Sequence, residues 1–139
     1  MIKYTETYTD FFGNERTEDV YFNLTSAELT EMEMGTTGGL STTLRNIIAS
    51  KDLPTISEYF KKLLLISYGE ISPDGRRFIK NKELSTAFEQ TQIFSNIYIR
   101  LLDADEAFKF IKGIMPNDLA SKIDDMAVKK EVEALSDIT

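Results

Sequence analysis

Residues 68–92, YGEISPDGRRFIKNKELSTAFEQTQ, determine how the rest of this chain is arranged. They join a strongly apolar helical pattern on one side to a long helical pattern on the other. Between the two, the sequence SPDG at 72–75 places serine first, proline second and glycine fourth, where a type I turn favours them. We therefore predict a rigid corner at 72–75, followed by a short extended segment over 76–79.

The helix before this corner is expected to be buried on more than one side. It begins between residues 53 and 56, because Pro54 suits a first helical turn and residues 55–58 form a capping-box pattern. Gly69 is expected to end it. Its apolar stripe consists of Ile56, Tyr59, Phe60, Leu63, Leu64 and Ser67.

After the corner, one long helix is predicted over roughly residues 82–102, with Asn81 as its N-cap. Its apolar residues fall on several faces, which is typical of a helix that lies at the centre of a fold or that also meets a partner. We predict that Ile93, Ile97 and Tyr98 contact a partner. On this interpretation, Ile97→Asp would abolish partner capture and leave the fold intact.

The corner itself carries a second candidate binding feature. Arg76 and Arg77 are adjacent, and two guanidinium groups can bind a phosphate or the carboxylates of a partner. The alternative is a solvated pair, or one held in the weak local ion pairs that are common at protein surfaces. We predict that the two arginines contribute to partner contacts or to self-association.

Two strand patterns precede the helices. Apolar and polar residues alternate over residues 2–9 and 16–24, on either side of a turn-forming Gly-Asn pair. This pattern predicts a β-hairpin. Because an isolated hairpin is only marginally stable, it should pack on the helices or pair with another copy.

The length of the hairpin loop decides which side chains share a face. A two-residue turn would place apolar residues of one strand opposite polar residues of the other. An odd-length loop that pairs Tyr8 with Val20, or Tyr4 with Phe22, keeps the apolar residues together. We therefore predict a loop of three or five residues.

A capping box follows the hairpin. The hydroxyl of Thr25 can accept the amide of Glu28, and the Glu28 carboxylate can reach back to the amide of Thr25. Leu24 and Leu29 fit the accompanying hydrophobic staple. A short helix is therefore expected over residues 26–34.

Glycines come next in the chain. Gly35 should stop the short helix in a left-handed cap, and Gly35, Gly38 and Gly39 together predict a hinge. A phosphate-binding loop would need lysine and then serine or threonine after the last glycine, whereas Leu40 and Ser41 follow here. The hinge interpretation is the one we adopt.

The C-terminal part continues the helical pattern. Asp103 and the acidic residues after it indicate a helix N-cap. A calcium loop starting at Asp103 would need glycine and glutamate where Phe108 and Ile114 stand, so no metal site is predicted. The helix that follows should be ended by Gly113 and Pro116.

The whole pattern predicts an α+β, mostly α fold, with an N-terminal β-hairpin followed by a bundle of about five helices. We expect a single domain over 1–128, made of the hairpin at 2–24 and a helical part at 25–128. Two of its helices are expected from the apolar residues around 40–48 and 119–127. Residues 129–139 are charged and small, and predict a flexible tail.

Composition excludes several classes of function. The 139 residues include no cysteine and no histidine, which removes thiolate nucleophiles, the commonest general base and the commonest transition-metal ligand. No combination of nucleophile, base and orienting group is evident, so we predict no enzyme, no catalytic residue and no cofactor. The net charge of −7 disfavours nucleic-acid binding.

No membrane or secretory segment is predicted either. The longest unbroken apolar run, at 63–66, is far too short to span a membrane, and the N-terminus has no apolar signal region. We expect the protein to stay in the cytoplasm where it is made.

Several parts of the sequence resemble the tail assembly chaperones of long-tailed bacteriophages. The central run, SPDGRRFIK followed by ELS and AFEQT, is the specific part of this resemblance. The resemblance covers most of the chain and extends over residues 19–24, 24–29, 72–80, 83–91 and 111–116.

This resemblance implies a function. Several copies of such chaperones coat the tape-measure protein, keep its helical, apolar segments soluble, recruit tail-tube subunits and are displaced as the tube polymerises. It therefore implies self-association, action in the host cytoplasm and absence from the mature virion. One alternative is a minor structural protein that is retained in the phage tail. A third interpretation is a bacterial adaptor unrelated to phage.

Overall fold

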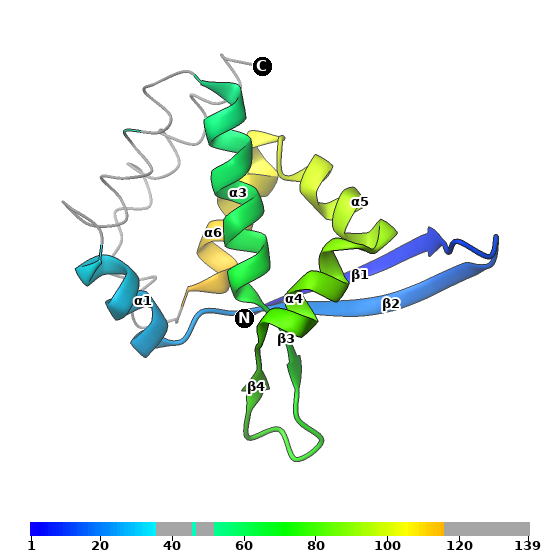
Figure 1. Cartoon of the computed structure of the whole chain (residues 1–139), viewed down its shortest axis with the longest axis horizontal. Helices are drawn as coiled ribbons and strands as arrows, with labels where there is room; N and C mark the ends of the chain where they lie inside the picture. Colours follow the sequence, from blue (N-terminus) through cyan, green and yellow to red (C-terminus); the bar gives the residue numbers. More distant parts are fainter. Residues whose placement is uncertain (36–45, 47–51, 116–139) are drawn as a thin grey trace.

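The computed structural model describes residues 1–35, 46 and 52–115 of the chain. Within them the predicted fold class is confirmed: an N-terminal hairpin is followed by helices, and helix predominates (Figure 1). The elements in chain order are β1 (Ile2–Thr9), β2 (Glu15–Phe22), α1 (Ser26–Met34), α3 (Leu53–Ser67), β3 (Tyr68–Ile71), β4 (Phe78–Ile79), α4 (Lys82–Glu89), α5 (Gln92–Arg100) and α6 (Ala104–Ile114).

The hairpin of β1 and β2 has a five-residue loop, as one of the two predicted lengths requires. Its register pairs Tyr4 with Val20 and Tyr8 with Arg16. Both predicted pairings were therefore wrong: the partner of Tyr4 lies two residues before Phe22, and the partner of Tyr8 lies four residues before Val20. Such even shifts keep each side chain on its face, because side chains alternate with a period of two. The loop closes at Asp10, whose carboxylate accepts hydrogen bonds from two loop amides.

A second hairpin, formed by β3 and β4, extends the sheet. The predicted corner is its turn: the amide of Gly75 donates to the carbonyl of Ser72 at 2.8 Å, and Gly75 has φ of 75°. Strand β2 pairs antiparallel with β3 through Tyr21 and Phe22, which gives a four-stranded sheet in the order β1-β2-β3-β4.

Gly69 does not end a helix, contrary to our prediction. Helix α3 ends at Ser67 and the chain enters β3 directly. A Cβ atom on Gly69 would lie 2.7 Å from the Phe78 ring and 2.8 Å from the carbonyl oxygen of Ile79. Glycine is therefore needed at this position because β3 and β4 approach each other closely there.

The predicted long helix over 82–102 is two helices, so this prediction was wrong. Asn81 caps α4 as expected, its side chain accepting the amide of Leu84 at 2.8 Å. Thr91 then starts α5: its hydroxyl donates to the carbonyl of Phe88 at 2.6 Å and accepts the amide of Phe94 at 3.1 Å. This corner lets both helices direct apolar side chains into one core.

The ends of the other helices agree in part with the sequence pattern. The capping box at Thr25 and the helix after it are confirmed, as is the N-cap at Asp103. Gly35 has φ of −81°, which is right-handed, so the left-handed cap was wrong. Gly113 lies inside α6, where a Cβ would come within 2.9 Å of Ile2, so it allows close packing and does not end the helix.

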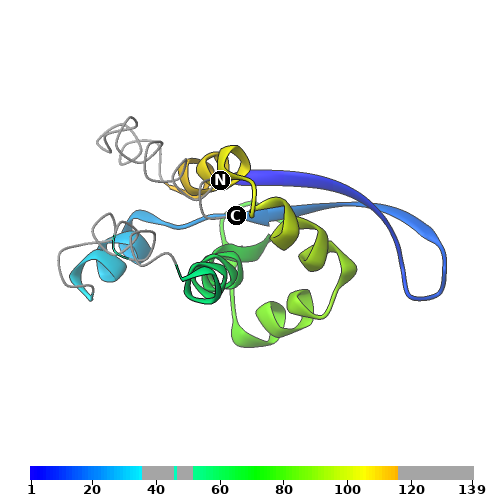
Figure 2. The same cartoon turned by 90° about the horizontal axis from the view of Figure 1, so that it is seen from above.

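One aromatic side chain occupies the centre of the core. Phe22 is fully buried, and its ring makes edge-on contacts at centroid distances of 5.6–5.9 Å. The helices gather around the inner half of the β1–β2 hairpin, whereas its loop projects away from them (Figures 1 and 2). The rings that contact Phe22 are those of Tyr4, Tyr68, Phe88 and Phe110.

Some predictions fall on residues that the structure does not describe. They are the hinge positions Gly38 and Gly39, the helical patterns around 40–48 and 119–127, and the tail at 129–139. The extent of the single domain therefore stays a prediction.

Candidate functional site

The residues predicted to contact a partner on α5 do not share one environment. Ile97 is fully buried and Ile93 is also in the core, so neither presents a surface and this part of our prediction needs correction. Tyr98 is half-buried and its ring stacks on that of Phe94 at 5.8 Å. The exposed apolar side chain of α5 is instead Ile99, which is 63% exposed.

Leu102, just beyond α5, is 43% exposed and lies three residues after Ile99. Residues three apart in helical geometry share a face. We call Ile99, Leu102 and the half-buried Tyr98 the α5 edge. It is an apolar strip on the outer side of a helix whose inner side completes the core.

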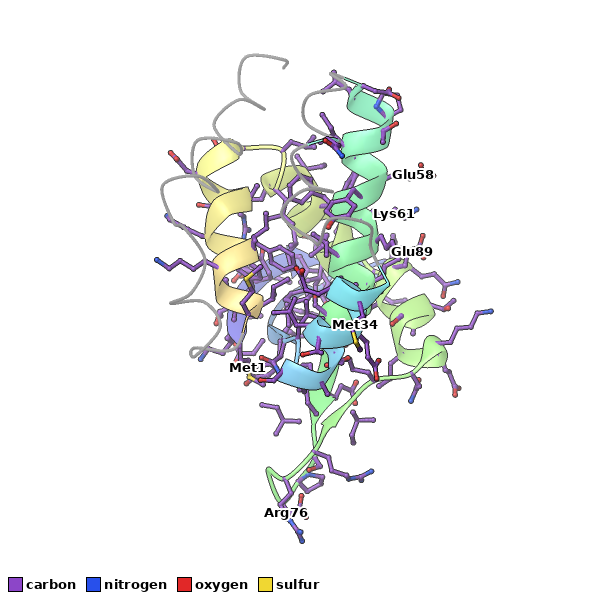
Figure 3. All side chains as sticks on the ribbon, turned by 90° about the vertical axis from the view of Figure 1, so that its left-hand side faces the viewer. Met1, Met34, Glu58, Lys61, Arg76 and Glu89 are labelled. Carbon is purple, nitrogen blue, oxygen red and sulfur yellow. The ribbon has the colours of Figure 1, made fainter. Side chains whose placement is uncertain are left out.

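Arg76 and Arg77 lie at the turn between β3 and β4, and both are exposed. Arg76 stands at the far end of this hairpin and points away from the body (Figure 3). The nearby Asp74 carboxylate accepts hydrogen bonds from the Ser72 hydroxyl at 2.6 Å and from the Arg76 amide at 3.1 Å. These bonds, the Ser72 bond foremost, lower the pKa of Asp74. The carboxylate thus stabilises the turn, and whether the arginines bind a partner stays a prediction.

Sequence analysis missed the two apolar side chains that are the most exposed among the described residues. Phe11 and Phe12, in the loop between β1 and β2, are 84% and 93% exposed. The loop is nevertheless well defined, because the Asp10 carboxylate accepts the amides of Phe12 and Asn14, each at 2.9 Å, and Gly13 has φ of 88°. We call Phe11 and Phe12 the aromatic tip. Two adjacent phenylalanines beside a Gly-Asn turn were the available sequence signal.

Acidic residues surround the aromatic tip. Arg16 is paired with Asp10 at 3.6 Å and with Glu18 at 2.9 Å, and these carboxylates raise the pKa of Arg16, Glu18 most of all. Glu15 is also exposed beside the loop. Three carboxylates and one guanidinium leave the tip with an excess of negative charge.

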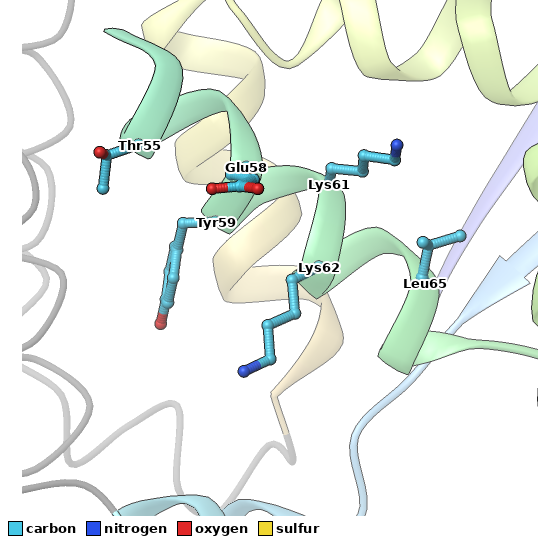
Figure 4. A pocket seen from close by; sticks show the side chains of 6 residues that line it. All are labelled: Thr55, Glu58, Tyr59, Lys61, Lys62 and Leu65. Carbon is cyan, nitrogen blue, oxygen red and sulfur yellow. The ribbon is translucent and has the colours of Figure 1, made fainter. Parts of the chain in front are cut away.

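A shallow groove of about 520 Å³ runs along α3 (Figure 4). Among the described residues, Lys62 forms no ion pair, whereas Lys61 is paired with Glu89 at 2.9 Å. Burial raises the pKa of Tyr59 to about 12, so its hydroxyl is neutral. The described lining residues, here called the α3 groove, are Thr55, Glu58, Tyr59, Lys61, Lys62 and Leu65.

An ion pair between a buried carboxylate and a partly exposed guanidinium holds α5 against the hairpin. Both carboxylate oxygens of the buried Glu6 meet the guanidinium of Arg100, at 2.6 and 2.9 Å. Tyr4 lies beside them with its ring centre 5.6 Å from the guanidinium carbon, and burial, followed by the charge of Glu106, raises the pKa of Tyr4 to about 12. The carboxylate is fully paired and the phenol is neutral, which suits a structural link better than a reactive group.

A second link joins α1 to β4. The Lys80 ammonium donates to the Glu28 carboxylate at 2.7 and 2.9 Å and to the carbonyl of Asn23 at 2.6 Å. Partial burial acts to raise the pKa of Glu28, but the bonds from Lys80 and from the Thr25 amide outweigh it and hold the pKa below its usual value.

Glu28→Gln tests this link through pH. A lowered folded pKa means that the carboxylate stabilises the fold above its unfolded pKa, and that this contribution is lost as pH falls through the folded pKa. The free energy of unfolding of the native chain should therefore fall more between about pH 6 and about pH 3 than that of the variant. The difference should be on the order of 1 kcal/mol or less, because the pair is partly exposed. Urea unfolding at both pH values measures it, with the exposed Glu31→Gln as control; parallel pH profiles would contradict the assignment.

Two kinds of site were searched for over the described ranges. No cluster of three or more cysteine, aspartate, glutamate or histidine side chains there could hold a metal ion. No described helix has the length and apolar character needed to cross a bilayer. The described surface instead has four features that could contact another protein. They are the aromatic tip, Arg76 and Arg77 at the turn between β3 and β4, the α5 edge and the α3 groove.

Comparison with known proteins identifies the kind of protein that carries these surfaces. The family model for phage tail assembly chaperones matches residues 1–138. Searches of curated proteins and of solved structures gave no significant match. A chaperone family suggests a non-enzymatic role and implies binding of phage tail proteins, and it decides against an adaptor unrelated to phage. Since the match covers nearly the whole chain, this protein belongs to the phage tail assembly chaperone family.

Proposed function

We propose that this chaperone binds the tape-measure protein of its phage, keeps that protein soluble and recruits tail-tube subunits during tail assembly. Several copies act on one tape-measure chain in the host cytoplasm and leave before the virion is complete. The observation that carries this proposal is the α5 edge, where Ile99 on α5 and Leu102 just after it expose apolar surface beside a helix whose other side is in the core.

The chemistry of the α5 edge suits a helical partner. An amphipathic helix binds by laying its apolar side chains, three or four residues apart, against an apolar strip or groove. A tape-measure chain is long and helical, so it offers such stripes repeatedly. The net charge of −7 would keep a chaperone-coated chain in solution by mutual repulsion.

Co-expression with the tape-measure protein tests the proposal. We expect a soluble complex with several copies of the chaperone per tape-measure chain, detected by pull-down and light scattering. Ile99→Asp should reduce capture by about tenfold or more, equivalent to about 1.4 kcal/mol, because it places a charge in the apolar contact. Met34→Asp alters an apolar residue on α1 that is 76% exposed, somewhat more than Ile99, and serves as the matched control.

Two outcomes would contradict the proposal. A tape-measure protein that stays insoluble beside a soluble chaperone would remove the assigned partner. Stoichiometric amounts of this protein in purified virions, measured by mass spectrometry, would favour the alternative of a minor structural protein retained in the tail.

A further inference from the structure

Strand β1 forms one edge of the sheet, and only β2 pairs with it among the described residues. At the loop end of the hairpin, the Asp10 amide donates to the Asn14 carbonyl at 2.8 Å. Hydrogen-bonded pairs alternate with unbonded pairs along an antiparallel ladder, so the even-numbered residues of β1 bond to β2. The residues whose backbone groups point away from β2, toward the open edge, are Lys3, Thr5, Thr7 and Thr9.

The other side of β2 confirms this alternation. Tyr21 pairs with Gly69, and the Asn23 amide donates to the carbonyl of Ser67 at 2.8 Å, so β2 directs its odd-numbered residues toward β3. Within the described part of the chain, no backbone hydrogen bond joins the outward groups of β1 to another element. A row of unpaired amides and carbonyls on an edge strand is a template for a further strand.

Little in β1 opposes such pairing. Proline and β-bulges often block exposed edges, but the eight residues of β1 include no proline and pair with β2 without a bulge. Its exposed face carries threonines at three positions, and threonine pairs are favourable across strands, as the Thr7 and Thr17 hydroxyls, 2.9 Å apart, illustrate. The one carboxylate of β1, on Glu6, is already held by Arg100 at 2.6 Å.

The charges and the secondary structure select a second copy of β1 as the added strand. The free edge of β2 ends where β3 begins to pair at Tyr21, and its exposed Glu15 and Asp19 would oppose carboxylates of another β2. For two copies of a chain with net charge −7, β1 is therefore the less repulsive edge. A helical tape-measure segment offers no free strand, because its backbone groups bond within the helix.

We infer that β1 of one copy pairs antiparallel with β1 of a second copy, which joins their two four-stranded sheets into one. This inference rests on the proposed function, in which several copies lie on one tape-measure chain, and it names the surface through which two of them meet. A register with Thr5 opposite Thr5 places the half-buried Ile2 opposite the half-buried Tyr8. It also prevents the two Glu6 carboxylates from facing each other. Because both open β1 edges are then used, assembly stops at a dimer.

A matched pair of proline variants tests the pairing on the purified chain. Thr7 and Thr17 lie directly opposite each other, both exposed, and the amide of each points away from the other strand. Thr7→Pro removes a donor from the open β1 edge and leaves the bonds to β2 in place. In sedimentation velocity, the native chain should approach the mass of a dimer as concentration rises, and Thr7→Pro should raise the dissociation constant at least about tenfold. Thr17→Pro makes the same change on the opposite edge and should dimerise like the native chain, with circular dichroism to compare the folding of the two variants.

Single cysteine variants test the register and do not depend on proline being tolerated. The chain has no cysteine, so one introduced thiol reports its own surroundings. Thr5→Cys should form disulfide-linked dimers under mild oxidation, because the Cα atoms of a hydrogen-bonded pair lie about 5.5 Å apart, within the range of a disulfide. Thr17→Cys, exposed on the same face of the hairpin, is the control and should stay largely monomeric.

Four outcomes would overturn the inference. They are a native chain that stays monomeric at every concentration, assembly beyond a dimer, a folded Thr7→Pro variant that dimerises like the native chain, and equal cross-linking of the Thr5→Cys and Thr17→Cys variants. Because these measurements contain no tape-measure protein, each result leaves the proposed function to its own co-expression test.

Discussion

Replacing Ile97 with aspartate should unfold this protein. The Ile97 side chain is fully buried in α5, among the core residues of the fold. Aspartate there would remove buried apolar contacts and would bury a carboxylate that has no partner, which costs several kcal/mol. Since domains of this size are stable by only about 5–15 kcal/mol, most of the folded population would be lost. Circular dichroism and thermal unfolding should show no cooperative transition.

Ile99→Asp is the matched control, two residues further along the same helix. Its side chain is 63% exposed, so the same change of chemistry should alter the free energy of unfolding by only about 0.5 kcal/mol. If Ile97→Asp kept a cooperative unfolding transition and lost only partner capture, Ile97 would lie on the partner-binding surface of α5 and not in the core. The sequence interpretation, which placed Ile97 on a partner surface, would then be correct.

Phe22→Ala should be the most damaging truncation in the sheet. Phe22 is fully buried, and four other rings lie within 5.9 Å of its centroid, from β1, β3, α4 and α6. Large-to-small core substitutions of phenylalanine cost about 3–5 kcal/mol, because the cavity collapses only in part. Urea unfolding should therefore show a much lower midpoint.

The control for this truncation is Phe12→Ala. The Phe12 side chain is 93% exposed, so its loss should change the free energy of unfolding by no more than about 0.5 kcal/mol. A Phe22→Ala variant that unfolded at nearly the native urea concentration would mean that the four rings can close the cavity. Phe22 would then not be the side chain on which the packing of the core depends.

The features that could be predicted from the amino-acid sequence are those that depend on short-range hydrogen bonds. The Thr25 capping box, the Asn81 and Asp103 caps and the 72–75 turn all formed where the pattern placed them. In each, donor and acceptor are two or three residues apart, so neighbouring residue types fix the geometry. Alternation of apolar residues also fixed the faces of the first hairpin, because a shift by an even number leaves each face unchanged.

Which surfaces face the core depends on how distant segments of the chain pack together. Helical spacing gives the angle between Ile97 and Ile99, but the break at Thr91 sets how α5 is turned relative to α4, and so which of the two is buried. The same holds for Gly69 and Gly113, whose lack of a side chain is explained by strands packed against them and not by helix ends. These outcomes depend on contacts between residues far apart in the chain, which local pattern does not encode. The family could therefore be inferred from the sequence, whereas the exposed α5 edge and aromatic tip required the fold.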